Sequence, residues 1–279
     1  MKRILITGTK SKLGLAFRKY INENYSNKEY EIETVSVRGD GWKEKDFSGF
    51  DVILHCAGIF NAPSQVYSYY QEINVDLTEA LAQKAALDHV KQFVYLSTMD
   101  VYKPGRITEE TKPDPQSLYG KSKLEAEEKI QANLGETDIK VAIVRCCPVI
   151  GANAESQTEG YMKAFKLPVF PIMFTDDKRS ILHVDTLCEL IRMVIDEESK
   201  GLFFPQNLPP LSVAEILKTI KDTTRNKTVL IKLPKFLWIK GPKTKRVFGS
   251  SYYEDSMSKH FDGRYILMSS KEIINTIFC

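Results

Sequence analysis

Short apolar segments alternate with helical segments through about residue 150, and this alternation constrains the fold more than any other feature of the chain. The segments expected as strands are 3–7, 32–37, 52–55, 92–97 and 140–145, and the expected helices cover roughly 13–25, 66–88 and 118–133. Strands separated by helices in this way form parallel sheets with helices on both faces. We therefore predict an α/β fold built on a Rossmann-type, doubly wound parallel sheet.

Beyond Gly151 the alternation gives way to a looser pattern, which marks a second part of the chain. Ser212 and Glu215 have the spacing of a capping box and predict a helix that runs to about Thr223. A chain of 279 residues is long enough for a Rossmann domain and a smaller lobe. We predict that residues 1–150, completed by about 179–205, form the Rossmann domain. Residues 151–178 and 206–279 would form a small carboxy-terminal substrate-binding lobe.

The first expected strand leads directly into a glycine-bearing turn. Residues 2–6 are mainly apolar, and Leu15, Phe17 and Ile21 beyond the turn have the spacing of a helix. Such a turn binds anions, because backbone N–H groups and the positive end of the helix dipole point at a bound phosphate. The predicted phosphate-binding residues are Gly8, Lys10, Ser11, Lys12, Leu13 and Gly14.

Tyr119 and Lys123 are four residues apart in a segment rich in strong helix formers, so we expect them on one face of a helix. A free tyrosine titrates near pH ~10 and is a poor proton-transfer group at neutral pH. A nearby cation favours the phenolate and lowers this pKa, which predicts a proton-transfer pair. Taken alone, the same spacing is more often a surface tyrosine beside a solvated lysine.

Two hydroxyl residues, Ser97 and Thr98, close the apolar segment that starts at Phe93. Open parallel sheets bind their ligands at the carboxyl ends of the strands. A hydroxyl at this strand end could hydrogen-bond a substrate oxygen beside Tyr119, although an ordinary transition from strand to loop has the same pattern.

Together these segments resemble the extended short-chain dehydrogenase/reductase superfamily, in its nucleotide-sugar epimerase/dehydratase branch. The resemblance covers nearly the whole chain, and its further matching segments are 54–58, 74–78, 115–123 and 179–185. It implies an NAD(P)-dependent enzyme that transfers hydride to or from a sugar nucleotide, either as an epimerase or as a reductase.

The resemblance also assigns roles to residues. It implies that Tyr119 takes the proton of a sugar hydroxyl, that Lys123 binds the nicotinamide ribose and depresses the tyrosine pKa, and that Thr98 orients the substrate oxygen. Besides the phosphate-binding turn, Tyr119 and Lys123, the implied cofactor-binding residues are Ser36, Arg38, Asp46, Phe47, Cys56, Ala57, Gly58, Asn74, Ser97 and Pro148. The implied substrate-binding residues are Thr98, Asp100, Asn153 and Arg179, with a surface ion pair as the alternative role of Arg179. No metal is implied.

Three departures from the family pattern bear on the reaction. Ser11 stands where the turn usually has its second glycine, so the turn must tolerate a Cβ atom there. Met99 replaces an acidic residue that dehydratases of the family use, so dehydration is the least expected reaction. The segment from Arg145 to Gly151 lacks the first proline and the tyrosine of the family's sugar-side segment.

The end of the second strand bears on the choice of cofactor. A carboxylate there accepts the ribose hydroxyls of NAD and repels the 2′-phosphate of NADP. Our placement puts Ser36 at this position, followed by Arg38, with Lys10 and Lys12 in the facing turn. This favours NADP slightly over NAD, whereas Asp40 would favour NAD if the strand ended later. Asp46 and Phe47 are expected to flank the adenine in either case.

Composition narrows the range of partners. The net charge of +3 is small and spread along the sequence, which gives no reason to expect nucleic acid. No stretch approaches the ~20 apolar residues that span a membrane, and no secretory signal precedes the first strand. Five cysteines without Cys-x-x-Cys spacing fit reduced, buried thiols. We expect a cytoplasmic protein with a small-molecule substrate, and family members suggest a possible homodimer.

Two other functions remain open at this stage. A non-catalytic dinucleotide-binding protein could sense redox state or act as a scaffold, although such a protein needs no proton-transfer group. A reductase of a non-nucleotide carbonyl compound would use the same three residues. The sequence does not identify the sugar, the nucleotide or the direction of the reaction.

Overall fold

The computed structural model describes residues 1–60, 66–151, 165–166, 168–173, 177–233 and 250–278. Its contacts divide the chain into two compact units. The first unit comprises Met1–Lys103, Lys112–Cys146 and Leu187–Phe204, and the second comprises Pro104–Thr111, Cys147–Thr186 and Pro205–Cys279. The late segment that completes the first unit therefore begins at Leu187. The sequence had predicted that this segment begins at about residue 179.

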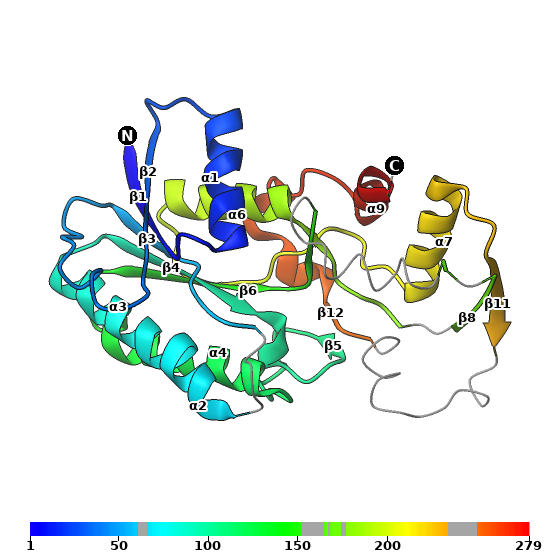
Figure 1. The fold of residues 1–279 in the computed structure, drawn as a ribbon, viewed down its shortest axis with the longest axis horizontal. Helices are drawn as coiled ribbons and strands as arrows, with labels where there is room; N and C mark the ends of the chain where they lie inside the picture. Colours follow the sequence, from blue (N-terminus) through cyan, green and yellow to red (C-terminus); the bar gives the residue numbers. More distant parts are fainter. Residues whose placement is uncertain (61–65, 152–164, 167, 174–176, 234–249, 279) are drawn as a thin grey trace. The chain divides into compact units, whose positions relative to one another are not determined.

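A six-stranded sheet forms the centre of the first unit (Figure 1). Its strands lie in the order β10-β6-β4-β3-β1-β2, and all five pairings are parallel. The strands are β1 (Lys2–Thr7), β2 (Tyr30–Val35), β3 (Val52–His55), β4 (Gln92–Thr98), β6 (Lys140–Cys146) and β10 (Gly201–Phe203). This sheet confirms the predicted fold class. Because β2 and β3 lie on opposite sides of β1, the carboxyl end of β1 is a topological switch point, where such sheets bind ligands.

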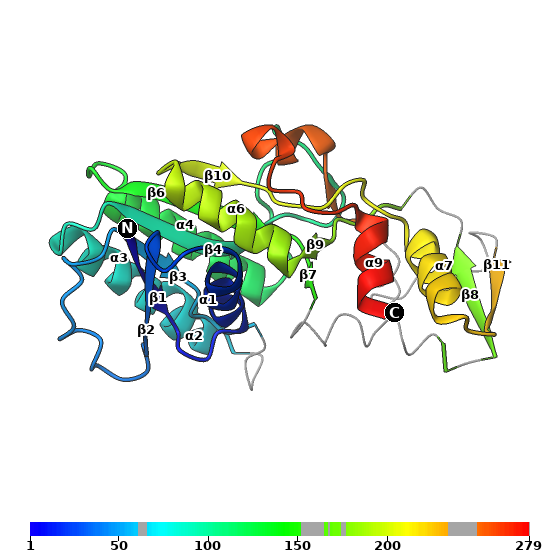
Figure 2. The ribbon, with the colours of Figure 1, turned by 90° about the horizontal axis from the view of Figure 1, so that it is seen from above.

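Helices cover both faces of this sheet. Figures 1 and 2 show α3 and α4 on one face and α1 and α6 on the other. The helices are α1 (Lys12–Asn24), α2 (Tyr67–Tyr70), the π-helix η1 (Gln71–Asp76), α3 (Leu77–Leu87), α4 (Leu118–Leu134) and α6 (Val184–Asp196), with a short 3-10 helix η2 at Met99–Val101. Apolar side chains of α3 and α4 pack on the sheet in a core that includes Leu81, Ile130, Leu5, Ile53 and Phe93. These five side chains are fully buried.

Three local expectations need correction. The helix expected over 66–88 consists of α2, η1 and α3, because a π-turn interrupts the α-helical hydrogen bonding. Strand β2 begins and ends two residues earlier than expected. As an edge strand it is half-buried along its whole length and therefore carries no continuous apolar run that would mark its bounds. The sixth strand, β10, was not expected, since it is only three residues long.

Among its described residues, the second unit has three small parallel pairs of strands and the α-helices α7 and α9. The strands are β5 (Arg106–Ile107) with β12 (Tyr252–Tyr253), β7 (Val149–Ile150) with β9 (Leu182–His183), and β8 (Val169–Met173) with β11 (Val229–Leu233). The helices are α7 (Val213–Thr224) and α9 (Ser270–Phe278), and 3-10 helices cover Asp255–Ser258 and His260–Gly263. The predicted capping box at the start of α7 is confirmed, with both reciprocal hydrogen bonds between Ser212 and Glu215 present.

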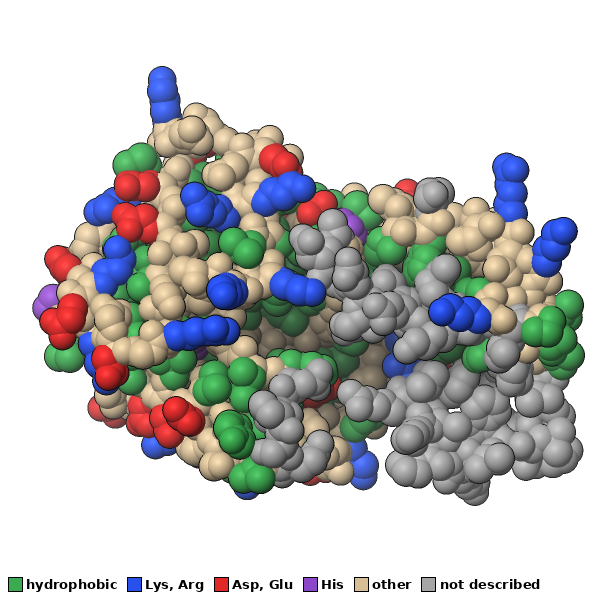
Figure 3. Space-filling view, in the orientation of Figure 1, with side chains coloured by type: hydrophobic (Ala, Val, Ile, Leu, Met, Phe, Trp, Pro, Cys, Tyr) green, Lys and Arg blue, Asp and Glu red, His purple; other side chains and the backbone are tan. Residues whose placement is uncertain are grey.

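The distribution of charged side chains at the surface agrees with the small net charge of +3. Figure 3 shows basic and acidic side chains interspersed over the visible face of the first unit. Within the described ranges, the structure has no helix that is both long and apolar enough to cross a membrane. Residues 232–246 form a stretch rich in basic and aromatic side chains that could contact a membrane surface, and most of them lie outside the residues that the structure describes.

Candidate active site

The turn after β1 brings three segments of the first unit together. Gly8 has a φ of +91°, and a Cβ atom added there would lie 3.2 Å from the Cα atom of Ala57. The Gly8 N–H donates to the carbonyl of Val35, the last residue of β2, over 2.9 Å. Glycine is therefore required at position 8 both by its backbone conformation and by its neighbour. The ends of β1 and β2 and the segment after β3 consequently meet at this turn.

Ser11 serves the turn without strain. Its φ of −66° and ψ of 120° are ordinary extended values, so the Cβ atom is tolerated, and its hydroxyl caps α1 by accepting from the N–H of Gly14. Lys12 and Leu13 occupy the next two positions, where helical N–H groups have no intrahelical acceptor. Lys10 and Lys12 are exposed. This combination of free N–H groups, a helix N-terminus and two cations is chemically suited to a phosphate.

The segment after β2 carries the residues that bear on the adenosine end of a dinucleotide. Ser36 and Arg38 are exposed and directly follow the strand, which ends at Val35. Asp40 lies further along and pairs with Lys43 at 2.6 Å. Asp46 is exposed.

The side chain of Phe47 does not occupy the position expected for it. Its ring is fully buried in the core beneath the sheet. The ring is therefore not available to flank an adenine, because it is fully buried and the Lys84 Nζ atom lies over it, 4.8 Å from its centroid. Any contact that this residue makes with a cofactor would come from its backbone.

Asn74 clamps the segment Cys56–Phe60 that follows β3. Its side chain accepts from the Ile59 N–H (2.8 Å) and donates to the Ile59 carbonyl (3.0 Å) and to the Ser122 hydroxyl (2.9 Å). Ser122 in turn donates to the carbonyl of Tyr119 over 2.8 Å. Asn74 is 1% exposed and both of its amide hydrogens are engaged. In this structure the residue therefore fixes the Gly58–Phe60 segment to α4, and it has no remaining hydrogen to donate to a cofactor.

Tyr119 lies in the first turn of α4. The helix begins at Ser117, whose hydroxyl accepts from the Gly120 N–H over 2.9 Å. The Tyr119 ring packs edge-to-face against Phe60, with 4.9 Å between ring centroids, and its hydroxyl interacts with the side chain of Thr98. The helix start thus directs the phenol at the end of β4.

The protonation of Tyr119 differs from the expectation. Burial is the largest cause that raises its pKa, and the nearby Asp100 carboxylate raises it further, while the hydrogen bond with Thr98 opposes them. The expected depression of the tyrosine pKa is therefore wrong for the protein alone, because desolvation outweighs any attraction from the lysine.

Lys123 follows one turn later and is 5% exposed. Its Nζ atom lies 4.0 Å from the ring centroid of Tyr95, a cation–π contact from β4. Burial lowers the Lys123 pKa to about 8, and Glu127 is the largest opposing influence. The ammonium thus sits between α4 and the sheet with a pKa close to neutrality.

Ser97 and Thr98, at the end of β4, contact different partners. Successive strand residues point to opposite faces. Thr98 is 8% exposed, interacts with Tyr119 and accepts from the Asp100 N–H over 3.2 Å. Ser97 instead donates its hydroxyl to Glu127 inside the protein. Asp100 is exposed and close to the phenol.

The remaining predicted residues belong to the second unit or lie outside the described residues. The carbonyl of Pro148 accepts from the Leu182 N–H over 3.0 Å. Arg179 forms backbone bridges with Leu211 and Ser251. Asn153 lies outside the described residues.

Four residues of the site were missed by the sequence reasoning. Phe60 and Tyr95 touch Tyr119 and Lys123, and Glu127 and Arg145 form a buried ion pair beside them. Glu127 had a detectable signal, since it lies one helical turn beyond Lys123 and shares its face. Phe60 and Tyr95 had none, because aromatic residues in a strand or loop are usually core.

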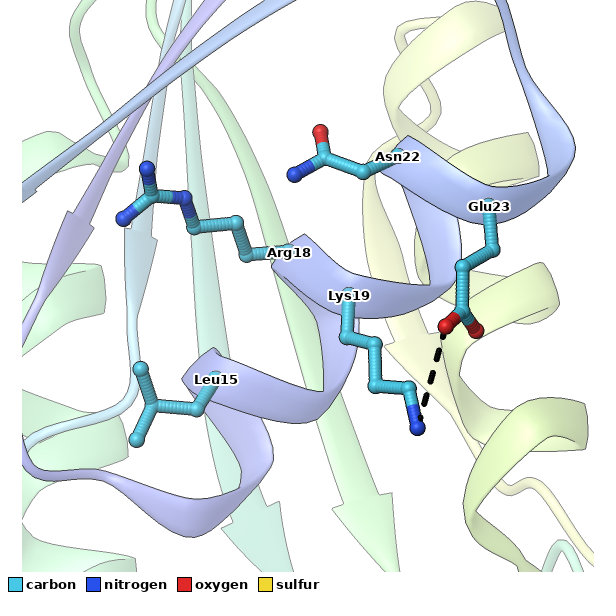
Figure 4. Close-up of a pocket in the computed structure, with 5 residues that line it drawn as sticks. All are labelled: Leu15, Arg18, Lys19, Asn22 and Glu23. Carbon is cyan, nitrogen blue, oxygen red and sulfur yellow. Dashed lines mark ion pairs between the residues drawn. The ribbon is translucent and has the colours of Figure 1, made fainter.

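One other feature of the first unit, on α1, does not belong to this site. Leu15, Arg18, Lys19, Asn22 and Glu23 line a shallow depression on α1, where Lys19 pairs with Glu23 at 3.7 Å (Figure 4). All five side chains come from one helix, and none is a predicted site residue. In the part of the chain that the structure describes, no group of three or more His, Cys, Asp or Glu side chains could hold a metal ion.

Residues 4–203 match the NAD dependent epimerase/dehydratase family. The chain belongs to this family. The match covers the whole Rossmann unit except its first three residues and Phe204. The family carries NAD in its description, which agrees with the phosphate-suited turn after β1.

Individual proteins add to the family assignment. The UDP-glucose 4-epimerase of Vibrio cholerae is 27% identical over 184 residues, which cover 61% of this chain and 56% of that protein. The chain thus spans a little over half the length of this curated relative. A dTDP-4-dehydrorhamnose reductase of Clostridium acetobutylicum superimposes with a TM-score of 0.76 at 22% identity, covering 99% of this chain and 98% of the other. The RMD protein of Pseudomonas aeruginosa, complexed with NADPH, gives a TM-score of 0.78 at 17% identity, with 100% and 98% coverage. The similarity of the chain to these two solved structures supports its fold.

Proposed function

We propose that the protein is an NAD(P)-dependent enzyme that epimerises or reduces a sugar nucleotide by hydride transfer. The observation that supports this most directly is the interaction of the Tyr119 hydroxyl with Thr98, with Lys123 buried one helical turn away. A phenol, an alcohol and an amine at the carboxyl end of a central parallel strand are the groups that this chemistry needs.

Each residue has a separate task in this proposal. Thr98 orients the substrate oxygen, and Tyr119 exchanges a proton with that oxygen. Lys123 binds the ribose next to the nicotinamide and supplies a positive charge beside the phenol. The nicotinamide, when bound, accepts or donates the hydride. Because burial raises the Tyr119 pKa in the protein alone, we infer that the phenol is the resting form and gives or takes its proton only with substrate in place.

The residues around the first turn support a dinucleotide cofactor. Gly8 allows close approach of the backbone, and Lys10 and Lys12 offer positive charge. NADP is slightly favoured over NAD, because Ser36 rather than a carboxylate follows β2 and Arg38 is exposed next to it. Arg38 has no ion-pair partner among the described residues, so its guanidinium is free for a 2′-phosphate.

The sugar-nucleotide substrate rests on the named relatives. The Vibrio cholerae relative is an epimerase of UDP-glucose, and the Clostridium acetobutylicum protein is a reductase of a dTDP-linked sugar. Asp100, Asn153 and Arg179 remain our proposed substrate contacts, and Pro148 remains a proposed cofactor contact. A homodimer and a cytoplasmic location remain expectations from the family resemblance.

One experiment separates the two reactions from the alternatives. The purified protein is incubated with UDP-glucose and NAD⁺ or NADP⁺, and separately with a dTDP-4-keto sugar and NADH or NADPH. A reductase consumes added NAD(P)H in step with substrate, whereas an epimerase converts UDP-glucose with no net change in nicotinamide absorbance. Turnover of neither sugar nucleotide, combined with reduction of simple carbonyl compounds, would favour the non-nucleotide reductase. Tight cofactor binding with no turnover of any substrate would favour the non-catalytic sensor.

A further inference from the structure

Glu127, one helical turn after Lys123 on α4, forms a buried ion pair with Arg145. Arg145, near the end of β6, donates from Nε to both carboxylate oxygens of Glu127 at 3.1 Å and from Nη2 to Oε2 at 2.6 Å. Arg145 is 6% exposed and Glu127 is 4% exposed. Both charges are therefore desolvated, and each depends on the other for compensation.

The pair joins three elements at the end of the sheet. Glu127 lies on α4, and its carboxylate also accepts from the hydroxyl of Ser97, the residue before Thr98 on β4. Arg145 lies on β6 and also donates to the hydroxyl of Tyr102. One carboxylate thus links the helix that carries Tyr119 and Lys123 to the strand that carries Thr98.

Glu127 is also the acidic group that acts on Lys123. The two residues are one helical turn apart on α4, and Glu127 is the largest of the influences that favour the ammonium. The other groups that face Lys123 are Cys146 from β6, Cys56 after β3, the ring of Tyr95 on β4, and His55 at the end of β3. Burial, followed by Lys123, lowers the His55 pKa to about 3, so this imidazole is neutral at physiological pH.

The thiols add no negative charge at neutral pH. Burial raises the pKa of both Cys56 and Cys146, so each remains protonated. Glu127 is consequently the one full negative charge, among the described groups that act on Lys123, that is present near pH 7.

We propose that Glu127, held by Arg145 and Ser97, is a positioning residue that keeps Lys123 in its ammonium form and fixes α4 against the end of β4. A salt bridge between Glu127 and Arg145 alone would be a costly way to gain stability, because well-packed apolar side chains serve a buried site equally well. Because Glu127 lies one helical turn from Lys123, its carboxylate can stabilise the Lys123 ammonium. The catalytic value of an ammonium at Lys123 rests on the proposed function. The effect of Glu127 on Lys123 can be tested without a substrate.

The test is the titration of Lys123 in the cofactor-free protein. Lysine labelled with ¹³C at Cε is incorporated, the Lys123 resonance is assigned by its loss in Lys123→Met, and its midpoint is followed with pH. In the native protein we expect a midpoint near the value to which burial lowers the pKa, about 8. In Glu127→Gln the midpoint falls by about one unit or more, because the carboxylate is lost and the Arg145 cation remains. Glu128→Gln, an exposed neighbour on α4, leaves the midpoint unchanged.

The direction of the shift distinguishes positioning from a merely structural role. If Glu127 only supported packing, its loss would admit water, and the Lys123 midpoint would rise toward the ordinary value of 10.5. An unchanged or raised midpoint in folded Glu127→Gln overturns the proposal.

A second variant keeps the proposal testable if Glu127→Gln does not fold. Glu127→Arg combined with Arg145→Glu reverses the pair, so the buried charges still compensate one another. A cation then lies one turn from Lys123, and we expect a lowered midpoint. A midpoint equal to that of the native protein overturns the proposal. Failure to find a substrate leaves both titrations interpretable, since neither requires turnover.

Discussion

A Cβ atom on Gly120 would overlap the backbone carbonyl oxygen of Asp100. The first turn of α4 therefore packs directly on the turn that follows β4, with no room for a side chain between them. This close approach is what brings the Tyr119 hydroxyl to Thr98. The glycine beside the tyrosine is thus as much a part of the site as the hydroxyl groups.

Gly120→Ala is expected to destabilise the protein by about 1–3 kcal/mol, because the added methyl forces α4 away from Asp100. At an uncrowded helical position, glycine to alanine would stabilise a protein by up to about 1 kcal/mol. A loss of stability in Gly120→Ala would therefore indicate the close contact with Asp100. Urea unfolding measures the difference. Gly41→Ala, at a position with nothing within 4 Å, is the control and should stay within a few tenths of a kcal/mol. Equal stability of the two variants would contradict the contact.

Tyr119→Phe is expected to reduce turnover by about 10²–10⁴-fold, since the proton-transfer group is lost while the ring and its contact with Phe60 remain. Cofactor affinity, measured by nicotinamide fluorescence, should change little. Tyr69→Phe, an exposed tyrosine on α2, is the matched control and should turn over normally. Turnover within tenfold of the native rate would remove the phenol from the reaction.

Arg38→Ala is expected to weaken NADPH binding by about tenfold or more and to leave NADH binding nearly unchanged, because only the 2′-phosphate would use the guanidinium. Titration of both cofactors measures the ratio of the two dissociation constants. Lys28→Ala, an exposed cation just before β2, is the control for charge alone. A native protein that binds NADH as tightly as NADPH, with a ratio that Arg38→Ala does not alter, would favour NAD.

Asn74→Asp is expected to destabilise the first unit by about 2–4 kcal/mol, because it removes both donors of the clamp and places a charge where the side chain is 1% exposed. The carbonyl of Ile59 and the hydroxyl of Ser122 would each lose a donor. Denaturant unfolding and amide hydrogen exchange at Ile59 provide the measurement. Asn22→Asp on the exposed face of α1 is the control, and similar losses in both variants would argue against a clamp.

Lys123→Met is expected to stabilise the protein at neutral pH. Burial lowers the Lys123 pKa from 10.5 to about 8. Between these values the unfolded chain binds a proton that the folded chain has released, so stability rises with pH across the window. Below pH 8 the folded protein bears the full cost of the buried ammonium, about 2–4 kcal/mol.

The gain from Lys123→Met should therefore be largest below pH 8 and shrink as the pH approaches 10.5. Thermal unfolding of the two proteins at several pH values measures it. Lys121→Met, an exposed lysine on the same helix, should show no such dependence. A constant difference between Lys123→Met and the native protein at all pH values would contradict a depressed lysine pKa.

The alternation of apolar and helical segments was sufficient to predict the parallel sheet, because burial on both faces demands apolar strands whatever their neighbours are. The spacing of Tyr119 and Lys123 likewise predicted one helical face. The π-turn at Gln71–Asp76 was not predicted, because the apolar spacing of residues 66–88 does not distinguish one π-turn from a continuous α-helix; the turn contains Asn74, which contacts Ile59. The bounds of β2 were predicted two residues too late, because this half-buried edge strand has no continuous apolar run.

The amino-acid sequence alone determined the alternation of strands and helices along the chain, the glycine-bearing turn after the first strand and the placement of Tyr119 and Lys123 on one helical face. These depend on local geometry and on the period of burial. Only the tertiary structure decided the charge states and partners: that Ser97 turns to Glu127 while Thr98 turns to Tyr119, and that burial raises the tyrosine pKa and lowers that of the lysine. Desolvation and buried ion pairing depend on atoms brought together from distant segments, and no local pattern encodes them.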